Sequence, residues 1–139
     1  MPNASLNPLL ALLFLAGCAT APQFHSHTSQ PLTGFSDPDN IRLSTLATTA
    51  TSSIHLVQVR HAEPLHIHAR HDLTVFLQQG YGTMRLAERT FAINPGDVLV
   101  IPAGTPHAFT NHSRQPALAV VVFSPPFDGQ DTVPVAESK

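Results

Sequence analysis

Short runs of β-branched and apolar residues alternate with turn residues along the chain after Ile41, at a spacing of roughly 8–12 residues. Examples are IRLSTL at 41–46, SSIHLVQV at 52–59 and LTVFLQQG at 73–80. No segment beyond Ile41 shows the apolar period of about 3.6 residues that an amphipathic helix needs. This pattern is typical of a β-sandwich or β-barrel, so an all-β fold is predicted.

Later segments fit the same prediction. YGTMRLAERTFAI at 81–93 predicts a hairpin, and ALAVVVF at 117–123 is apolar on both faces and is therefore expected to be buried on both sides. The proline-rich tail from Ser124 cannot be an interior strand and is expected to lie extended over the barrel. It would either cover a sheet edge or be exchanged between the subunits of a homodimer.

Composition limits the classes of protein that the chain can belong to. Its 139 residues suggest one domain, and 42% hydrophobic against 12% charged residues supports a packed core. The formal net charge is −2 and there is no cluster of lysine and arginine. Nucleic acid is therefore not an expected partner.

The first residues resemble an export signal. LLALLFLA at 9–16 is too short to span a bilayer but fits the apolar region of a secretory signal peptide. LAGC at 15–18 resembles the lipobox of bacterial lipoproteins, which implies cleavage before Cys18 and a diacylglycerol on its thiol. The alternatives are an ordinary signal peptide with a chance cysteine, or a short buried helix, and residues 1–8 lack the usual positive charge.

This resemblance divides the chain into three parts. Residues 1–17 would be the signal peptide, residues 18–40 the lipidated cysteine with a flexible tether rich in Ser, Thr, Pro and Gly, and residues 41–139 the barrel with its tail. The expected location is the bacterial cell envelope, on its periplasmic face, with the membrane reached through the lipid. Ala19 in place of Asp after the cysteine favours the outer membrane.

HIHARHD at 66–72 places three histidines and a carboxylate in seven residues. Side chains two apart on a strand point the same way, so His66, His68 and Asp72 would share a face if the strand continues. Neutral imidazole and carboxylate are suitable ligands for Fe, Mn, Zn, Ni or Cu. A divalent metal ion is therefore a candidate cofactor, but two histidines alone are a weak signal, and a distant third would strengthen it.

A distant segment carries a more specific resemblance. GDVLVIPAGTPHAFTN at 96–111 matches the second cupin motif, G-x5-P-x-G-x2-H-x3-N, at Gly96, Pro102, Gly104, His107 and Asn111. HIHARHD is then similar to the first cupin motif. Cupins are double-stranded β-helix, or jelly-roll, barrels. The resemblance covers about residues 54–123 and implies a metal ion inside the barrel, held by His66, His68, Asp72 and His107.

The fourth ligand is the open point of this resemblance. The family's glutamate position falls on Asp72 when counted from His68, but on Leu73, which cannot bind a metal, when counted back from Gly80. One extra residue, accommodated in a bulge, would explain the offset. The alternatives are therefore Asp72, His71 as its rival, or three histidines with water completing the shell.

The sequence also suggests structural, surface or lining positions for several other residues. Asn111 is interpreted as structural, and three histidines without a motif position are expected at the surface or just behind the ligands: His55, His61 and His112. Polar groups that could lie at the mouth of the barrel are Gln78, Tyr81 and Arg85. An apolar lining is expected from Phe76, Met84, Phe109 and Phe123.

The cupin resemblance does not select one reaction. A small metal-dependent enzyme of oxygenase or isomerase type is one hypothesis, acting on a carbonyl or enol-type molecule because no basic cluster could hold a phosphate. The alternatives are a non-enzymatic module that binds a metal or small ligand at the cell envelope, and a structural lipoprotein. No catalytic residue beyond the ligands can be assigned from the sequence.

Overall fold

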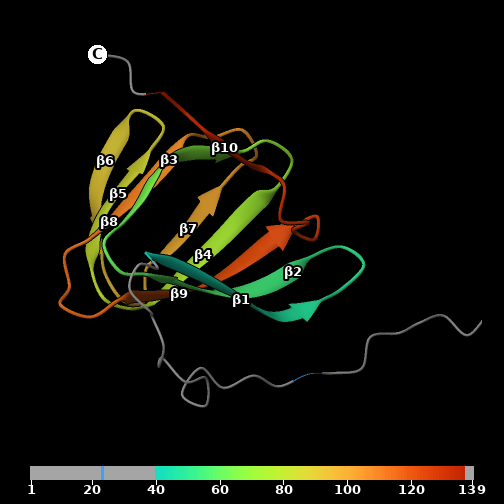
Figure 1. The fold of residues 1–139 in the computed structure, drawn as a ribbon, viewed down its shortest axis with the longest axis horizontal. Helices are drawn as coiled ribbons and strands as arrows, with labels where there is room; N and C mark the ends of the chain where they lie inside the picture. Colours follow the sequence, from blue (N-terminus) through green and yellow to red (C-terminus); the bar gives the residue numbers. More distant parts are fainter. Residues whose placement is uncertain (1–22, 24–39, 137–139) are drawn as a thin grey trace, which may run out of the picture.

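The computed structural model describes residue 23 and residues 40–136. The predicted signal peptide, Cys18 and the tether other than Gln23 and Asn40 lie outside the described residues. The described part contains ten strands in two five-stranded antiparallel sheets, which face each other (Figure 1). In this part of the chain, no helix is long and apolar enough to cross a bilayer.

The first sheet has the order β1-β2-β9-β4-β7. Its strands are β1 (Ile41–Thr48), β2 (Ser53–Val59), β9 (Ala117–Ser124), β4 (Asp72–Gln79) and β7 (Val98–Ile101). The second sheet has the order β10-β3-β8-β5-β6. Its strands are β10 (Thr132–Pro134), β3 (Ala62–His68), β8 (His107–Asn111), β5 (Gly82–Leu86) and β6 (Arg89–Ile93).

The chain crosses repeatedly between the two sheets, as β3 leads into β4 and β7 leads into β8. This is the double-stranded β-helix, or jelly roll, and the predicted fold class is confirmed. The hairpin predicted for residues 81–93 is formed by β5 and β6, with Leu86 opposite Arg89. Its two-residue turn holds Ala87 at φ 51°, the positive sign that such tight hairpin turns require.

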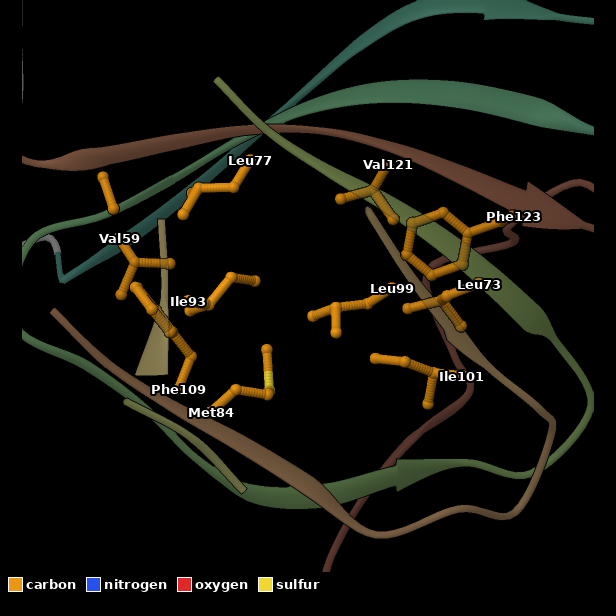
Figure 2. Close-up of a cluster of buried hydrophobic side chains, with 11 residues drawn as sticks. Val59, Leu73, Leu77, Met84, Ile93, Leu99, Ile101, Phe109, Val121 and Phe123 are labelled. Atoms are coloured by element: carbon orange, nitrogen blue, oxygen red, sulfur yellow. The ribbon is translucent and has the colours of Figure 1, made fainter. Parts of the chain in front are cut away.

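Period-two alternation builds the core. On β4, Leu73 and Leu77 are buried and point toward the second sheet, and Ile101 on β7 is only 1% exposed. Side chains from both sheets meet in one apolar cluster (Figure 2). Its members are Val59, Leu73, Leu77, Met84, Ile93, Leu99, Ile101, Phe109, Ala117, Val121 and Phe123. The barrel is therefore held together from within by apolar packing between the sheets.

The expectation that 117–123 is buried on both sides is wrong for two residues. Ala119, Val121 and Phe123 face the interior of the barrel, but Val120 and Val122 are only half-buried. These two valines point to the outer face of the first sheet, where their neighbours are side chains of the same layer. A central strand is paired on both edges, but that does not cover both of its faces.

The C-terminal tail forms a short edge strand. β10 pairs with β3, placing Thr132 opposite His68 and Pro134 opposite His66. Just before β10, Asp131 accepts hydrogen bonds from the backbone N–H of Arg70 at 2.9 Å and from its Nε at 3.2 Å. The tail thus covers the edge of the strand that carries two of the motif histidines.

Candidate metal centre

Three histidines converge inside the barrel. His66 and His68 lie two apart on β3 and so share a face, while His107 on β8 is directly opposite His66. Their exposed fractions are 5%, 6% and 2% respectively. One ligand atom from each lies within 4.8 Å of the other two. The structure therefore brings together the three histidines that the two motifs predicted.

Backbone hydrogen bonds orient two of these rings. The Nδ1–H of His66 donates to the carbonyl of Pro64 at 2.8 Å, and the Nδ1–H of His107 donates to the carbonyl of Thr105 at 2.9 Å. Because a carbonyl oxygen only accepts, each Nε2 is left with its lone pair. The Nε2 atoms of His66 and His68 lie 3.3 Å apart. Two such nitrogens either share a proton or bind a common ion.

Burial keeps the imidazoles of His68 and His107 neutral. It lowers the pKa of His68 to about 4, and the neighbouring His66 and His107 act in the same direction. Burial also lowers the pKa of His107 to about 4, against the opposing effect of its hydrogen bond to Thr105. Neutral imidazole is the form that binds a metal, so no proton has to be displaced from these two rings at neutral pH.

The ring of His68 lies in apolar surroundings. It stands edge-on to Phe123 and Phe127, with centroid distances of 5.2 and 5.7 Å, and its Nδ1 is buried without a hydrogen-bond partner. A buried polar ring held in this way is costly unless its other nitrogen gains a strong interaction. The donor set, its protonation and this unpartnered atom all fit a divalent transition metal bound by three imidazoles.

The structure does not bring Asp72 to this cluster. β3 ends at His68 and Asp72 begins β4 in the other sheet, so the shared strand face does not extend to residue 72. Leu73 points into the barrel, and Asp72 therefore points outward. Its exposed carboxylate accepts a hydrogen bond from the backbone N–H of Ala103 at 2.8 Å.

His71 is also directed elsewhere. Its Nδ1 is hydrogen-bonded to the carboxylate of Asp131, and its Nε2 lies 3.2 Å from the carbonyl of Pro126. Both ring nitrogens are thus engaged by groups that accept hydrogen bonds. The residue is buried and links the start of β4 to the C-terminal tail.

An apolar cavity of about 330 Å³ opens beside the histidines. Three of the four residues expected to line it do so, namely Met84, Phe109 and Phe123. Phe76 does not line it, because it alternates with the inward-facing Val75 and Leu77 on β4. The polar residues expected at the mouth do not line the cavity either: Gln78, Tyr81 and Arg85.

Sequence reasoning missed Glu63, which lines the cavity on the side of His66. Its Oε1 lies 3.8 Å from the Nε2 of His66. Burial raises the pKa of the Glu63 carboxyl, and the charge of His66 partly offsets this. On a regular strand, residues 63 and 66 would face opposite sides. Strand alternation therefore did not place Glu63 with the histidines. The sequence feature that could have indicated the inward position of Glu63 is Pro64, because proline within a strand marks an edge or a bulge.

The remaining predicted residues serve the framework. Asn111 donates from its amide to the carbonyls of Arg60 at 3.0 Å and Gln115 at 2.8 Å, in keeping with the structural role expected for it. His61 and His112 are exposed. His55 is 3% exposed and is hydrogen-bonded to Ser53 at 2.7 Å. Its ring stands edge-on to Phe123, which also contacts His68, so of the two expected positions it has the one behind the histidine cluster.

Comparisons with known proteins agree with this fold. Residues 53–123 match the family described as the cupin domain. An uncharacterized protein of Aquifex aeolicus (strain VF5) is 35% identical over 97 residues, which cover 70% of this chain and 79% of that protein.

Two solved structures are similar to this chain over about two thirds of its length. KdgF from Halomonas sp. is 26% identical with a TM-score of 0.61, covering 67% of this chain and 88% of that chain. TT1209 from Thermus thermophilus is 26% identical with a TM-score of 0.59, covering 66% of this chain and 89% of that chain.

The fold and site define a small double-stranded β-helix protein with a buried three-histidine cluster. The match over 53–123 and the Aquifex relative give that class a family: the chain belongs to the cupins.

Proposed function

We propose that the barrel binds a divalent transition-metal ion through His66, His68 and His107 and presents it to a small molecule in the cavity. The observation that carries this proposal is the convergence of three buried imidazoles at one side of an apolar cavity. Three protein ligands leave coordination positions open for such a molecule. A bound metal would polarise a carbonyl or stabilise an enolate oxygen, the chemistry that oxygenase-type and isomerase-type enzymes use.

The cavity lining supports a small, mostly apolar substrate. Residues such as Met84, Phe109 and Phe123 would hold its carbon skeleton and exclude water, while its oxygen faces the histidines. Among the described residues, no lysine or arginine lines the cavity. A carbonyl or enol-type molecule therefore suits the site better than a phosphorylated sugar.

Metal content and thermal unfolding test the first part of the proposal. The wild-type protein should take up a divalent ion. Free metal ion at a hundred times its Kd should raise the free energy of unfolding by about 2.7 kcal/mol. His68→Ala should abolish the metal-induced rise in Tm. His61→Ala is the matched control, since His61 is exposed, and should keep that rise. If wild type and His68→Ala respond alike to added metal, the metal site is elsewhere or absent.

Turnover tests the second part. Iron-loaded protein would be incubated with a panel of enol and catechol-like compounds, with oxygen uptake and isomerisation measured. Uptake that His68→Ala abolishes supports an enzyme. Tight metal binding without turnover of any member of the panel would favour the alternative, a non-enzymatic module that binds a metal or small ligand.

We also propose that the mature protein is a lipoprotein of the bacterial cell envelope. The support is the apolar run 9–16 followed by LAGC at 15–18, with a spacer rich in Ser, Thr, Pro and Gly before the barrel. Cys18 would carry the lipid, residues 18–40 would be the tether, and the barrel would lie on the periplasmic face of the outer membrane.

A further inference from the structure

We propose that Glu63 is the carboxylate ligand of the metal centre, supplied by β3 rather than by β4, where the motif placed Asp72. This inference rests on the proposed function, because it requires that the barrel bind a metal. It assigns the fourth ligand to a residue that precedes His66 by three positions and has no place in either motif.

A β-bulge directs Glu63 into the barrel. Glu63 pairs with Phe109 and His66 pairs with His107, so β3 has two residues between these pairs where β8 has one. The bulge therefore lies at Pro64 and Leu65 and reverses the alternation between Glu63 and His66. Directly paired side chains share a face, and Phe109 lines the cavity. Glu63 therefore points to the same interior as the histidines.

The distances bring Glu63 within reach of the metal position. Its Oε1 lies 3.8 Å from the Nε2 of His66. Two ligands at about 2.1 Å from one tetrahedral ion are roughly 3.4 Å apart. The carboxylate stands on the His66 side of the cluster, outside the group of three mutually close nitrogens. Rotation about its side-chain bonds would carry an oxygen toward the ion.

The negative charge of Glu63 also favours its assignment as a metal ligand. A carboxylate that faces an apolar cavity is costly to ionise unless a cation pairs with it. Within the described residues the cavity lining holds no lysine or arginine, and the side chain of Glu63 is only 25% exposed. A divalent ion on the three histidines would supply the missing positive charge. Asp72 needs no such partner, since it is exposed and accepts the N–H of Ala103.

Cobalt binding and infrared spectroscopy test this assignment on the full chain. Co²⁺ would be titrated into metal-free wild type, Glu63→Gln and the matched control Asp72→Asn, with the dissociation constant read from the visible absorption bands. Infrared difference spectra on adding Co²⁺ report whether a carboxylate becomes a ligand. Thermal unfolding of the metal-free variants shows that each one is folded.

The wild type should show a shift of a carboxylate stretching band. Glu63→Gln should lose that shift and bind Co²⁺ at least about tenfold more weakly, whereas Asp72→Asn should keep the shift and stay within about twofold of wild type. The proposal is overturned if Glu63→Gln retains the shift, if Asp72→Asn loses it, or if wild type binds Co²⁺ with no carboxylate shift. Absence of Co²⁺ binding by wild type would instead contradict the proposed function.

Discussion

At the scale of single residues, the environment of each histidine decides what it can do. His68 and His107 are buried among apolar groups and other imidazoles, which disfavours their charged forms and leaves nitrogen lone pairs free for a metal. His71 is equally buried, but Asp131 and Pro126 engage both of its nitrogens. Nine histidines in one chain therefore do not amount to nine candidate ligands.

The lowered pKa values predict how acid affects the metal-free protein. His68 and His107 have a pKa of about 4 in the folded state against 6.5 as the ordinary value, so below pH 6.5 the unfolded chain binds protons that the folded protein does not. The contribution of these two groups to the free energy of unfolding should be greatest above pH 6.5, fall as the pH decreases, and level off near pH 4. Denaturant unfolding at several pH values measures this.

A double variant provides the control for that measurement. His68→Gln combined with His107→Gln removes both depressed groups, so its stability should vary less between pH 6.5 and pH 4 than that of wild type. Equal slopes in the two proteins would show that other groups cause the acid sensitivity.

At the scale of elements, β3 is the strand on which the site depends. It lies between β8, which brings His107, and β10, which covers its other edge. β10 is held through Asp131, which accepts hydrogen bonds from Arg70 and His71. Burial opposes the charge of Asp131, but these hydrogen bonds outweigh it and hold the pKa of that carboxyl well below its usual range. The tail is thus part of the wall around the histidine cluster.

Asp131→Asn should loosen this tail. Replacing the carboxylate by an amide removes the charge that pairs with Arg70 and His71, so β10 should open more often. Hydrogen exchange measures this at the amide of Val135, which donates to Leu65 across the β3 edge. Asp128→Asn is the matched control, because Asp128 is exposed and pairs with the same Arg70, while its other contact is the backbone N–H of the nearby Gln130. Equal exchange rates in both variants would show that Asp131 does not hold the tail.

At the scale of the whole molecule, the proposed anchor would determine where the barrel works. Cys18→Ser should move the protein from the membrane fraction to the soluble periplasmic fraction, since serine cannot carry the thioether-linked lipid. Ala19→Asp should leave the protein lipidated but shift it from the outer to the inner membrane. Cell fractionation with metabolic labelling by a fatty acid measures both. Unlabelled wild-type protein would contradict the lipoprotein proposal and leave the proposal of a metal site untouched.

Much of the fold could be predicted because it is encoded locally. The alternation on 73–80, the hairpin at 81–93 and the corner around Pro102 and Gly104 are each written within a few residues. The same holds for the histidine pair on β3 and for His107, whose motif places it at the start of a strand. These local patterns predicted a sandwich or barrel, and the resemblance of two segments to the cupin motifs implied the jelly roll and the three histidines that meet inside it.

Local sequence patterns did not predict which carboxylate lies beside the histidines. Alternation predicted that Asp72 would join His66 and His68, but the chain leaves β3 after His68 and enters the opposite sheet. Alternation would also have placed Glu63 facing away from His66, but a bulge against β8 turns it inward. The sequence by itself therefore determined the fold class and the histidine triad. Only the tertiary structure decided which acid faces them, because strand ends and bulges are set by pairing with distant strands.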